Sequence, residues 1–193
     1  MGWKNVKEHY QIGHIVCVTS KGLCIGSPYV HDLLCIKDAE SPQDFEDTID
    51  RQCTSLGNGL QVWRPKHLGR GQPFDGWVEA MQDDPAKLRE LIDTPDTFER
   101  SLTVYTCDYY LGTIIEKQCE EYGWPNVTHD GDLMYDNSFS ANRSEVVAYA
   151  KRNAAAGLES LDRRVGEVER DLVEIRRRRD QFATALKKLE CET

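Results

Sequence analysis

The sequence predicts an α+β protein, with a small mixed or antiparallel sheet and short helices followed by a long C-terminal coiled-coil helix. Three observations predict this class. Short β-prone runs separated by turn residues fill the first part of the chain, and helical patterns alternate with strand patterns after them. A heptad-spaced apolar pattern without proline then covers residues 158–189. We therefore expect an acidic α+β body over residues 1–140 and a long helix over residues 141–193.

The first forty residues indicate β-structure. Residues 14–18 and 23–26 are β-prone runs on either side of a Gly-containing turn at 19–22, and this order predicts a hairpin. A Ser-Pro pair ends the second run, and residues 30–37 then predict a third strand.

The middle of the chain predicts a loop, a strand and two helices. Residues 38–59 are acidic and contain Gln, Ser and Gly, so they predict a loop with at most one short helix. Residues 60–63 predict a strand, and residues 74–82 have helical patterning. Residues 85–92 predict a second helix, because Asp84 is a favourable N-cap and proline is tolerated at the first helical position.

Two further elements complete the predicted body. Residues 102–107 have the β-branched and aromatic composition of a strand. Residues 113–122 predict a short helix that Gly123 and Pro125 would end.

The C-terminal segment predicts one long helix that carries a coiled-coil seam, meaning the a and d positions of its heptads. Asn142 followed by Glu145 fits a capping box, and no proline occurs after it. Nine of the ten seam residues are apolar, and their spacing of 3.5 favours a left-handed supercoil. The seam consists of Leu158, Leu161, Val165, Val168, Leu172, Ile175, Arg179, Phe182, Leu186 and Leu189.

The charges that flank this seam favour self-association. In a parallel pair of chains, Arg164 would face Glu169 and Asp171 would face Arg176, and both pairings are attractive. A parallel homodimer is therefore the predicted partner arrangement, with a trimer as the nearest alternative because two d positions are β-branched. The other alternative is that the helix packs back against its own body.

The charge distribution points to protein partners. Residues 1–140 carry 12 Lys and Arg against 23 Asp and Glu, a net charge of −11, whereas residues 141–193 carry 12 against 10. Such a body repels phosphates, which disfavours direct nucleic-acid binding and leaves solubility or a basic protein partner as explanations. The four consecutive arginines at 176–179 are flanked by the acidic residues Glu169, Asp171, Glu174 and Asp180, and together they predict a solvated helix face.

Cysteine usage and hydropathy predict a cytoplasmic protein without a membrane span. The seven cysteines show no Cys-x-x-Cys spacing, and Cys17, Cys24 and Cys35 lie in apolar runs typical of reduced core thiols. No apolar run approaches the roughly 20 residues of a membrane helix, and the N-terminus lacks the apolar core of a signal peptide.

Motifs for catalysis are sparse, and no cofactor is predicted. The sequence has no nucleophile elbow and no glycine-rich phosphate loop. The enzymatic alternative is a metal-dependent hydrolase that uses His129, Asp130 and Asp132, with His31 as a further ligand. The Asp130-Gly131-Asp132 run is equally ordinary turn chemistry.

Aromatic residues gather between positions 105 and 135. The set that could bind a partner is Tyr109, Tyr110, Tyr122, Trp124 and Tyr135. Because Trp and Tyr dominate both interfaces and small cores, a recognition patch and a packing role both stay open.

One resemblance bears on function. The acidic body, the run Tyr122-Gly123-Trp124-Pro125-Asn126 followed by His129-Asp130-Gly131-Asp132, and the coiled tail together resemble small accessory proteins of tailed bacteriophages. The resemblance implies action in a bacterial host, either on a host protein or in assembly with virion parts, and it transfers no site residue.

These observations predict a non-enzymatic, oligomeric protein-binding or assembly protein that presents an acidic body on a coiled-coil helix. The metal-dependent hydrolase and a structural or scaffold component of a virion are the two alternatives.

Overall fold

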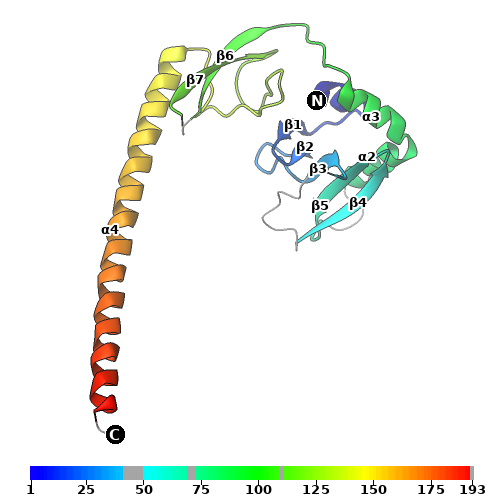
Figure 1. The fold of residues 1–193 in the computed structure, drawn as a ribbon. Coiled ribbons are helices and arrows are strands. Elements are labelled where there is room, and N and C mark those ends of the chain that lie inside the picture. The colour runs from blue at the N-terminus through cyan, green and yellow to red at the C-terminus, as the bar shows by residue number, and fades with distance from the viewer. Residues whose placement is uncertain (41–49, 69–72, 109–110, 192–193) are drawn as a thin grey trace. The chain divides into compact units, whose positions relative to one another are not determined.

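The predicted α+β class is confirmed in the computed structural model, which describes residues 1–40, 50–68, 73–108 and 111–191 (Figure 1). Its contacts divide the chain into two units, Met1–Val147 and Ala148–Thr193. Within the described residues, the first unit holds two antiparallel sheets, three short helices and the start of the long C-terminal helix, and the second unit holds the rest of that helix.

The larger sheet has five antiparallel strands in the order β1-β2-β3-β5-β4. The predicted hairpin forms its first two strands, and Gly22 at its turn has a φ of +107°, which glycine tolerates. The strands are β1 (Ile15–Thr19), β2 (Gly22–Gly26), β3 (Leu34–Asp38), β4 (Arg51–Gly57) and β5 (Leu60–Pro65).

Successive side chains along the strands point to opposite faces of the sheet, and each face packs in a different apolar core. Val16, Leu23 and Leu34 belong to the main core, which the apolar faces of the helices complete. Their neighbours Cys17, Cys24 and Cys35, with Trp63, point to the opposite face and form a smaller cluster there.

Three short helices supply the other half of the main core. They are α1 (Trp3–His9), α2 (Pro73–Asp83) and α3 (Pro85–Asp93), of which the last two match the predicted helices. The Asp84 carboxylate accepts a hydrogen bond from the Lys87 backbone N–H at 2.9 Å, which confirms the predicted N-cap. The sequence interpretation did not anticipate α1.

The smaller sheet corrects the prediction for residues 113–122. Strands β6 (Leu102–Asp108) and β7 (Thr113–Cys119) pair in antiparallel register across Gly112, whose φ is +65°, so this segment is a strand and not a helix. The β-branched Thr113, Ile114 and Ile115 favour the strand once β6 provides a partner. Val104 and Cys119 then pack with Met134 in a third cluster.

Two other boundaries differ from the prediction. The strand predicted over residues 30–37 begins only at Leu34, because Ser27 and Val30 hydrogen-bond to each other in a turn. Part of the predicted loop at 38–59 is strand β4. It is the last strand of the sheet and pairs on one edge only, and its polar side chains suit this position. The remainder, residues 41–49, lies outside the described residues.

The long helix α4 runs from Arg143 to Glu190. Its N-cap is Asn142, whose side-chain oxygen accepts from the Ser144 N–H at 3.0 Å. Glu145 departs from the predicted capping box, because it accepts from the Ser140 hydroxyl at 2.6 Å. None of the helices in the described ranges combines the length and apolar character that crossing a membrane requires.

Candidate interaction site

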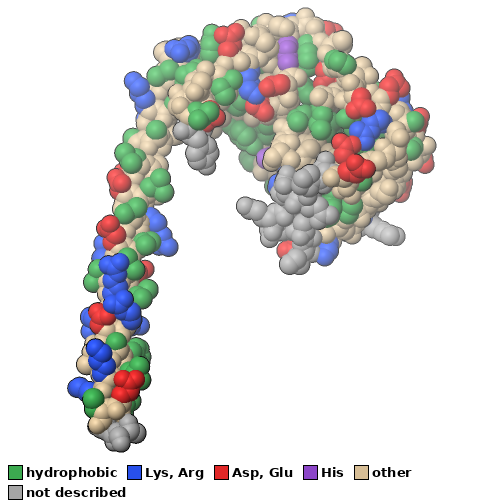
Figure 2. Space-filling view, viewed as in Figure 1, with side chains coloured by type: hydrophobic (Ala, Val, Ile, Leu, Met, Phe, Trp, Pro, Cys, Tyr) green, Lys and Arg blue, Asp and Glu red, His purple; other side chains and the backbone are tan. Residues whose placement is uncertain are grey.

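The seam residues of α4 form an uninterrupted exposed stripe along the second unit. Its nine apolar side chains range from 44 % exposed at Leu172 to 77 % at Phe182, whereas Val146 in the first turn is buried. Figure 2 shows hydrophobic side chains along this helix between charged ones. A stripe of this length is far more apolar than the scattered single residues of an ordinary surface.

Ion pairs within α4 use much of its charge. Glu174 accepts from Arg177 and Arg178 at 2.9 Å each, and Arg164 pairs with Glu167 at 3.0 Å. The two arginines hold the pKa of Glu174 below its usual range through these hydrogen bonds. The arginine run therefore has its charge partly neutralised within the helix, which suits a solvated face.

The residues of the metal alternative are engaged in other contacts. The His129 ring stacks on Phe98 with centroids 3.7 Å apart, and its Nε2 lies 3.0 Å from the Arg100 carbonyl. Trp3 donates to the His129 carbonyl at 3.1 Å, so this loop is fixed to α1. His129 therefore acts as a packing residue here.

Both acidic residues of that motif bind Lys117. Its ammonium lies 2.6 Å from Asp130 and also pairs with Asp132. Burial alone would raise the pKa of Asp130. The hydrogen bonds from Lys117 and Thr128 have the larger combined effect, so the pKa of Asp130 lies below its usual value. Gly131 between them has φ of +98°, which is turn geometry. Within the described ranges, no group of three or more His, Cys, Asp or Glu side chains is placed to hold a metal ion.

The structure spreads the predicted aromatic residues over one part of the first unit. Tyr122 is 50 % exposed, and Tyr135 is 38 % exposed with its hydroxyl 3.4 Å from His31 Nδ1. Trp124 contacts the ring of Tyr29 edge-on, with centroids 5.3 Å apart. Tyr109 and Tyr110 lie outside the described residues.

Tyr29 is the residue that the sequence interpretation missed. It is 84 % exposed and follows Pro28 in the turn before β3, almost a hundred residues from Trp124. An exposed aromatic residue in a Ser-Pro turn was the available signal, but nothing local indicates its contact with Trp124.

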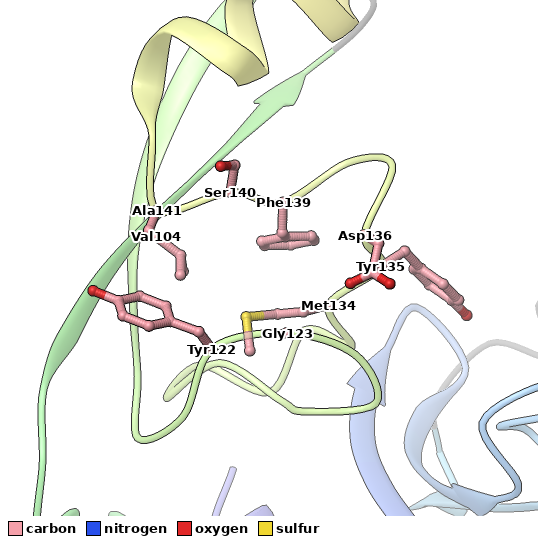
Figure 3. A pocket seen from close by; sticks show the side chains of 9 residues that line it. All are labelled: Val104, Tyr122, Gly123, Met134, Tyr135, Asp136, Phe139, Ser140 and Ala141. Carbon is pink, nitrogen blue, oxygen red and sulfur yellow. The ribbon is translucent and has the colours of Figure 1, made fainter.

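The hollow beside Tyr122 is small. Figure 3 shows Tyr122, Met134 and Phe139 around it, with Val104, Ser140 and Ala141 also in its lining. Its volume of about 30 Å³ is that of one water-sized group and far below the roughly 300 Å³ of a small ligand site. This hollow therefore has no room for a small ligand, and the exposed stripe of α4 is the candidate functional surface that both the sequence and the structure indicate.

Comparisons of the chain with protein-family models, with curated proteins and with solved structures found no significant match.

Proposed function

We propose that this protein is an oligomeric binding or assembly protein in which α4 joins two copies in parallel. The observation that carries the proposal is the exposed seam, nine apolar side chains at heptad spacing over residues 158–189. A second copy has the same stripe, so the two stripes can cover each other and remove their apolar side chains from water. The occupant of the seam is therefore a second α4.

The expected energetics favour burial of this seam. Each full-size apolar side chain removed from water contributes roughly 1.5–3 kcal/mol before entropy. The surface ion pairs of α4 contribute at most about 0.5 kcal/mol apiece, as for other exposed helix pairs. Apolar packing therefore decides whether the helices associate, and the charges only adjust their alignment.

The flanking charges support the parallel alignment. Arg164 would meet Glu169 of the second copy, and Asp171 would meet its Arg176. Arg164 now pairs with Glu167 on its own helix, but its side chain is 69 % exposed and can rotate toward the new partner. The alignment thus replaces a weak local pair with one across the interface.

Arg179 is the seam position that costs stability. In the parallel arrangement the two Arg179 side chains would meet, and each is paired at 2.6 Å with its neighbour Asp180. This pairing reduces the repulsion between the two guanidinium groups. A charged a position of this kind restricts the register in which two helices align.

The acidic body is the part that would contact other molecules. Its net charge of −11 supports a basic protein partner, and the exposed Tyr29 and Tyr122 add aromatic contact area. The resemblance to tailed-phage accessory proteins supports a host protein in the bacterial cytoplasm as that partner. Assembly into a virion is the alternative that the same resemblance allows.

Cross-linking tests the parallel alignment. In a background with the exposed Cys53 and Cys191 changed to Ser, we expect Val168→Cys to form a covalent dimer under mild oxidation. A d position faces its own copy in a parallel pair, so the new thiols meet. Arg170→Cys, which lies on the outer face of the helix, is the matched control and should stay monomeric on a non-reducing gel.

A different result would contradict the alignment. If Val168→Cys alone gives no cross-link but a mixture of Val168→Cys and Arg179→Cys chains does, the helices are antiparallel. If neither forms a cross-link, the helices do not pair along this seam.

A further inference from the structure

Cysteines line up across the larger sheet on the face opposite the main core. The strand register places Cys17 opposite Cys24, Cys24 opposite Cys35, and Cys35 opposite Trp63. The three cysteines are fully buried in one cluster on this face. Valine or alanine could fill these buried positions equally well, so packing alone does not explain a row of cysteines.

The thiols of Cys24 and Cys35 are already in contact. Their Sγ atoms lie 3.4 Å apart on directly opposed residues of β2 and β3. Opposed residues of antiparallel strands have Cα atoms about 4.5–5.5 Å apart, within the range of about 4.4–6.8 Å that disulfides span. Side-chain rotation is therefore enough to bring the sulfurs to bonding distance.

We propose that Cys24 and Cys35 are a redox-active pair that a hydroperoxide converts to a reversible disulfide. The Cys24 thiolate attacks the peroxide oxygen, the O–O bond breaks, and the alkoxide or hydroxide leaves and takes up a proton. Cys24 is then a sulfenic acid. The Cys35 sulfur attacks the Cys24 sulfur, the S–O bond breaks, and the hydroxyl leaves with the Cys35 proton as water. The two thiols together supply the two electrons that reduce the peroxide.

The surroundings make Cys24 the attacking sulfur. The hydrogen bond between the two thiols lowers the pKa of Cys24 despite burial, and a contact with the Thr19 hydroxyl, whose Oγ1 is 3.2 Å away, acts in the same direction. The same contact with Cys24 raises the pKa of Cys35, which suits a group that keeps its proton until the second step. Cys17 is the weaker candidate, because burial raises its pKa to about 12.

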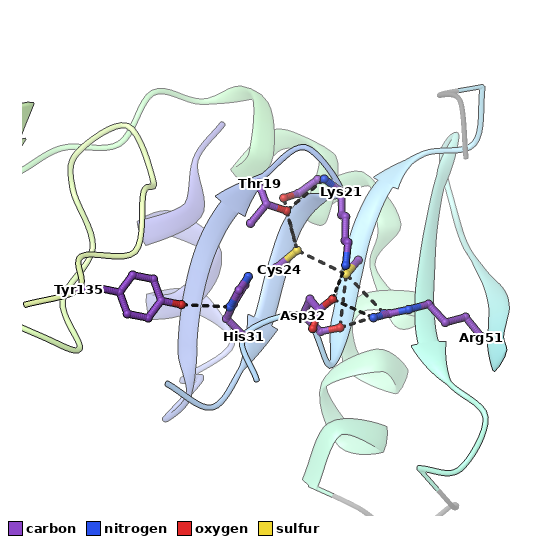
Figure 4. A network of polar contacts seen from close by, with 9 residues as sticks. Thr19, Lys21, Cys24, His31, Asp32, Arg51 and Tyr135 are labelled. Atoms are coloured by element: carbon purple, nitrogen blue, oxygen red, sulfur yellow. Dashed lines mark hydrogen bonds and ion pairs between the residues drawn. The ribbon is translucent and has the colours of Figure 1, made fainter. Parts of the chain in front are cut away.

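The charge of Asp32 beside the pair raises the pKa of both thiols, and the charges of Lys21 at Cys24 and of Arg51 at Cys35 oppose this effect. Lys21 and Arg51 bind its carboxylate at 2.6 and 2.8 Å, and Arg51 Nη1 lies 3.8 Å from the Cys35 sulfur (Figure 4). The two cations together outnumber the carboxylate. The network therefore leaves a net positive charge beside the pair.

An open hollow lies at the β1 end of the cysteine row. Cys17, Thr19 and His31 are among the residues that line this hollow of about 260 Å³, whereas Cys24 and Cys35 do not line it. Thr19 is half-buried, and its hydroxyl is the group between this hollow and Cys24. A hydroperoxide is small enough to enter this hollow.

Thiol mapping tests the proposal on the full chain. After treatment with hydrogen peroxide, denaturation and alkylation, we expect peptides joined through Cys24 and Cys35, with both thiols restored by dithiothreitol. Cys107 and Cys119 serve as internal controls and should stay reduced, since neither lies opposite another cysteine. Unmodified protein suffices for this measurement, so it does not depend on the folding of a variant.

Two variants separate the roles of the cysteines. Cys35→Ser should leave Cys24 as a sulfenic acid that dimedone labels, whereas Cys17→Ser should form the disulfide as the unmodified protein does. Free Cys24 and Cys35 after peroxide treatment, or a bond that joins Cys17 to Cys24, would overturn the proposal.

Discussion

Replacing Leu172 and Ile175 with Asp is expected to convert the proposed dimer into a monomer while the first unit stays folded. The change removes four apolar side chains from each dimer interface, worth roughly 1.5–3 kcal/mol each. It also places four carboxylates where none can be hydrated. Association should weaken by at least about 10⁴-fold, which sedimentation velocity measures directly.

The matched control is Val173→Asp with Thr184→Asp. Val173 is 66 % exposed and Ile175 is 63 % exposed in the single chain, so exposure does not distinguish them. Only heptad spacing does, since Val173 and Thr184 lie off the seam. If the control dissociates as readily as the seam variant, added charge and not seam packing explains the effect.

Replacing Gly131 with Ala is expected to cost about 2–4 kcal/mol, the second large effect. Its φ is +98°, and an added Cβ would lie 2.6 Å from the Val18 Cβ and 3.2 Å from the Val18 nitrogen. The Gly131 carbonyl also accepts from the Val18 N–H at 2.8 Å, so a shift of the loop breaks a contact with β1. The melting temperature of the first unit should fall by roughly 5–15 °C.

Gly123→Ala is the control for backbone strain. Its φ of +89° is similar, but an added Cβ would meet no atom within 4 Å. Gly123→Ala should therefore lower the melting temperature by less than half as much as Gly131→Ala. Equal decreases in melting temperature for the two variants would mean that the contact of residue 131 with Val18 does not contribute to the destabilisation.

Elements with local signals could be predicted from the sequence. The Asp84-Pro85 pair marks the start of α3, and the proline-free heptads after Asn142 mark α4. Residues 113–122 were predicted wrongly because the alternation in β7 is weak and its strand character comes from pairing with β6, which local patterning does not reveal. The same reason explains why residues 51–57 were taken for loop, since β5 supplies their partner.

The candidate sites also differ in whether local sequence patterns reveal them. The seam of α4 follows from spacing alone, and the structure places all ten predicted positions on one helix. The contact between Tyr29 and Trp124, and the alignment of Cys24 with Cys35, depend on tertiary contacts and strand register. Sequence patterning identified Cys24 and Cys35 as buried thiols, and only the register of β2 and β3 brings them together.

The mass of the unmodified protein in solution tests the central claim most directly. Light scattering at tens of micromolar should give twice the chain mass of 22.1 kDa. A mass of one chain at that concentration would contradict self-association through α4, and the seam of Leu158–Leu189 would then have to find its partner elsewhere.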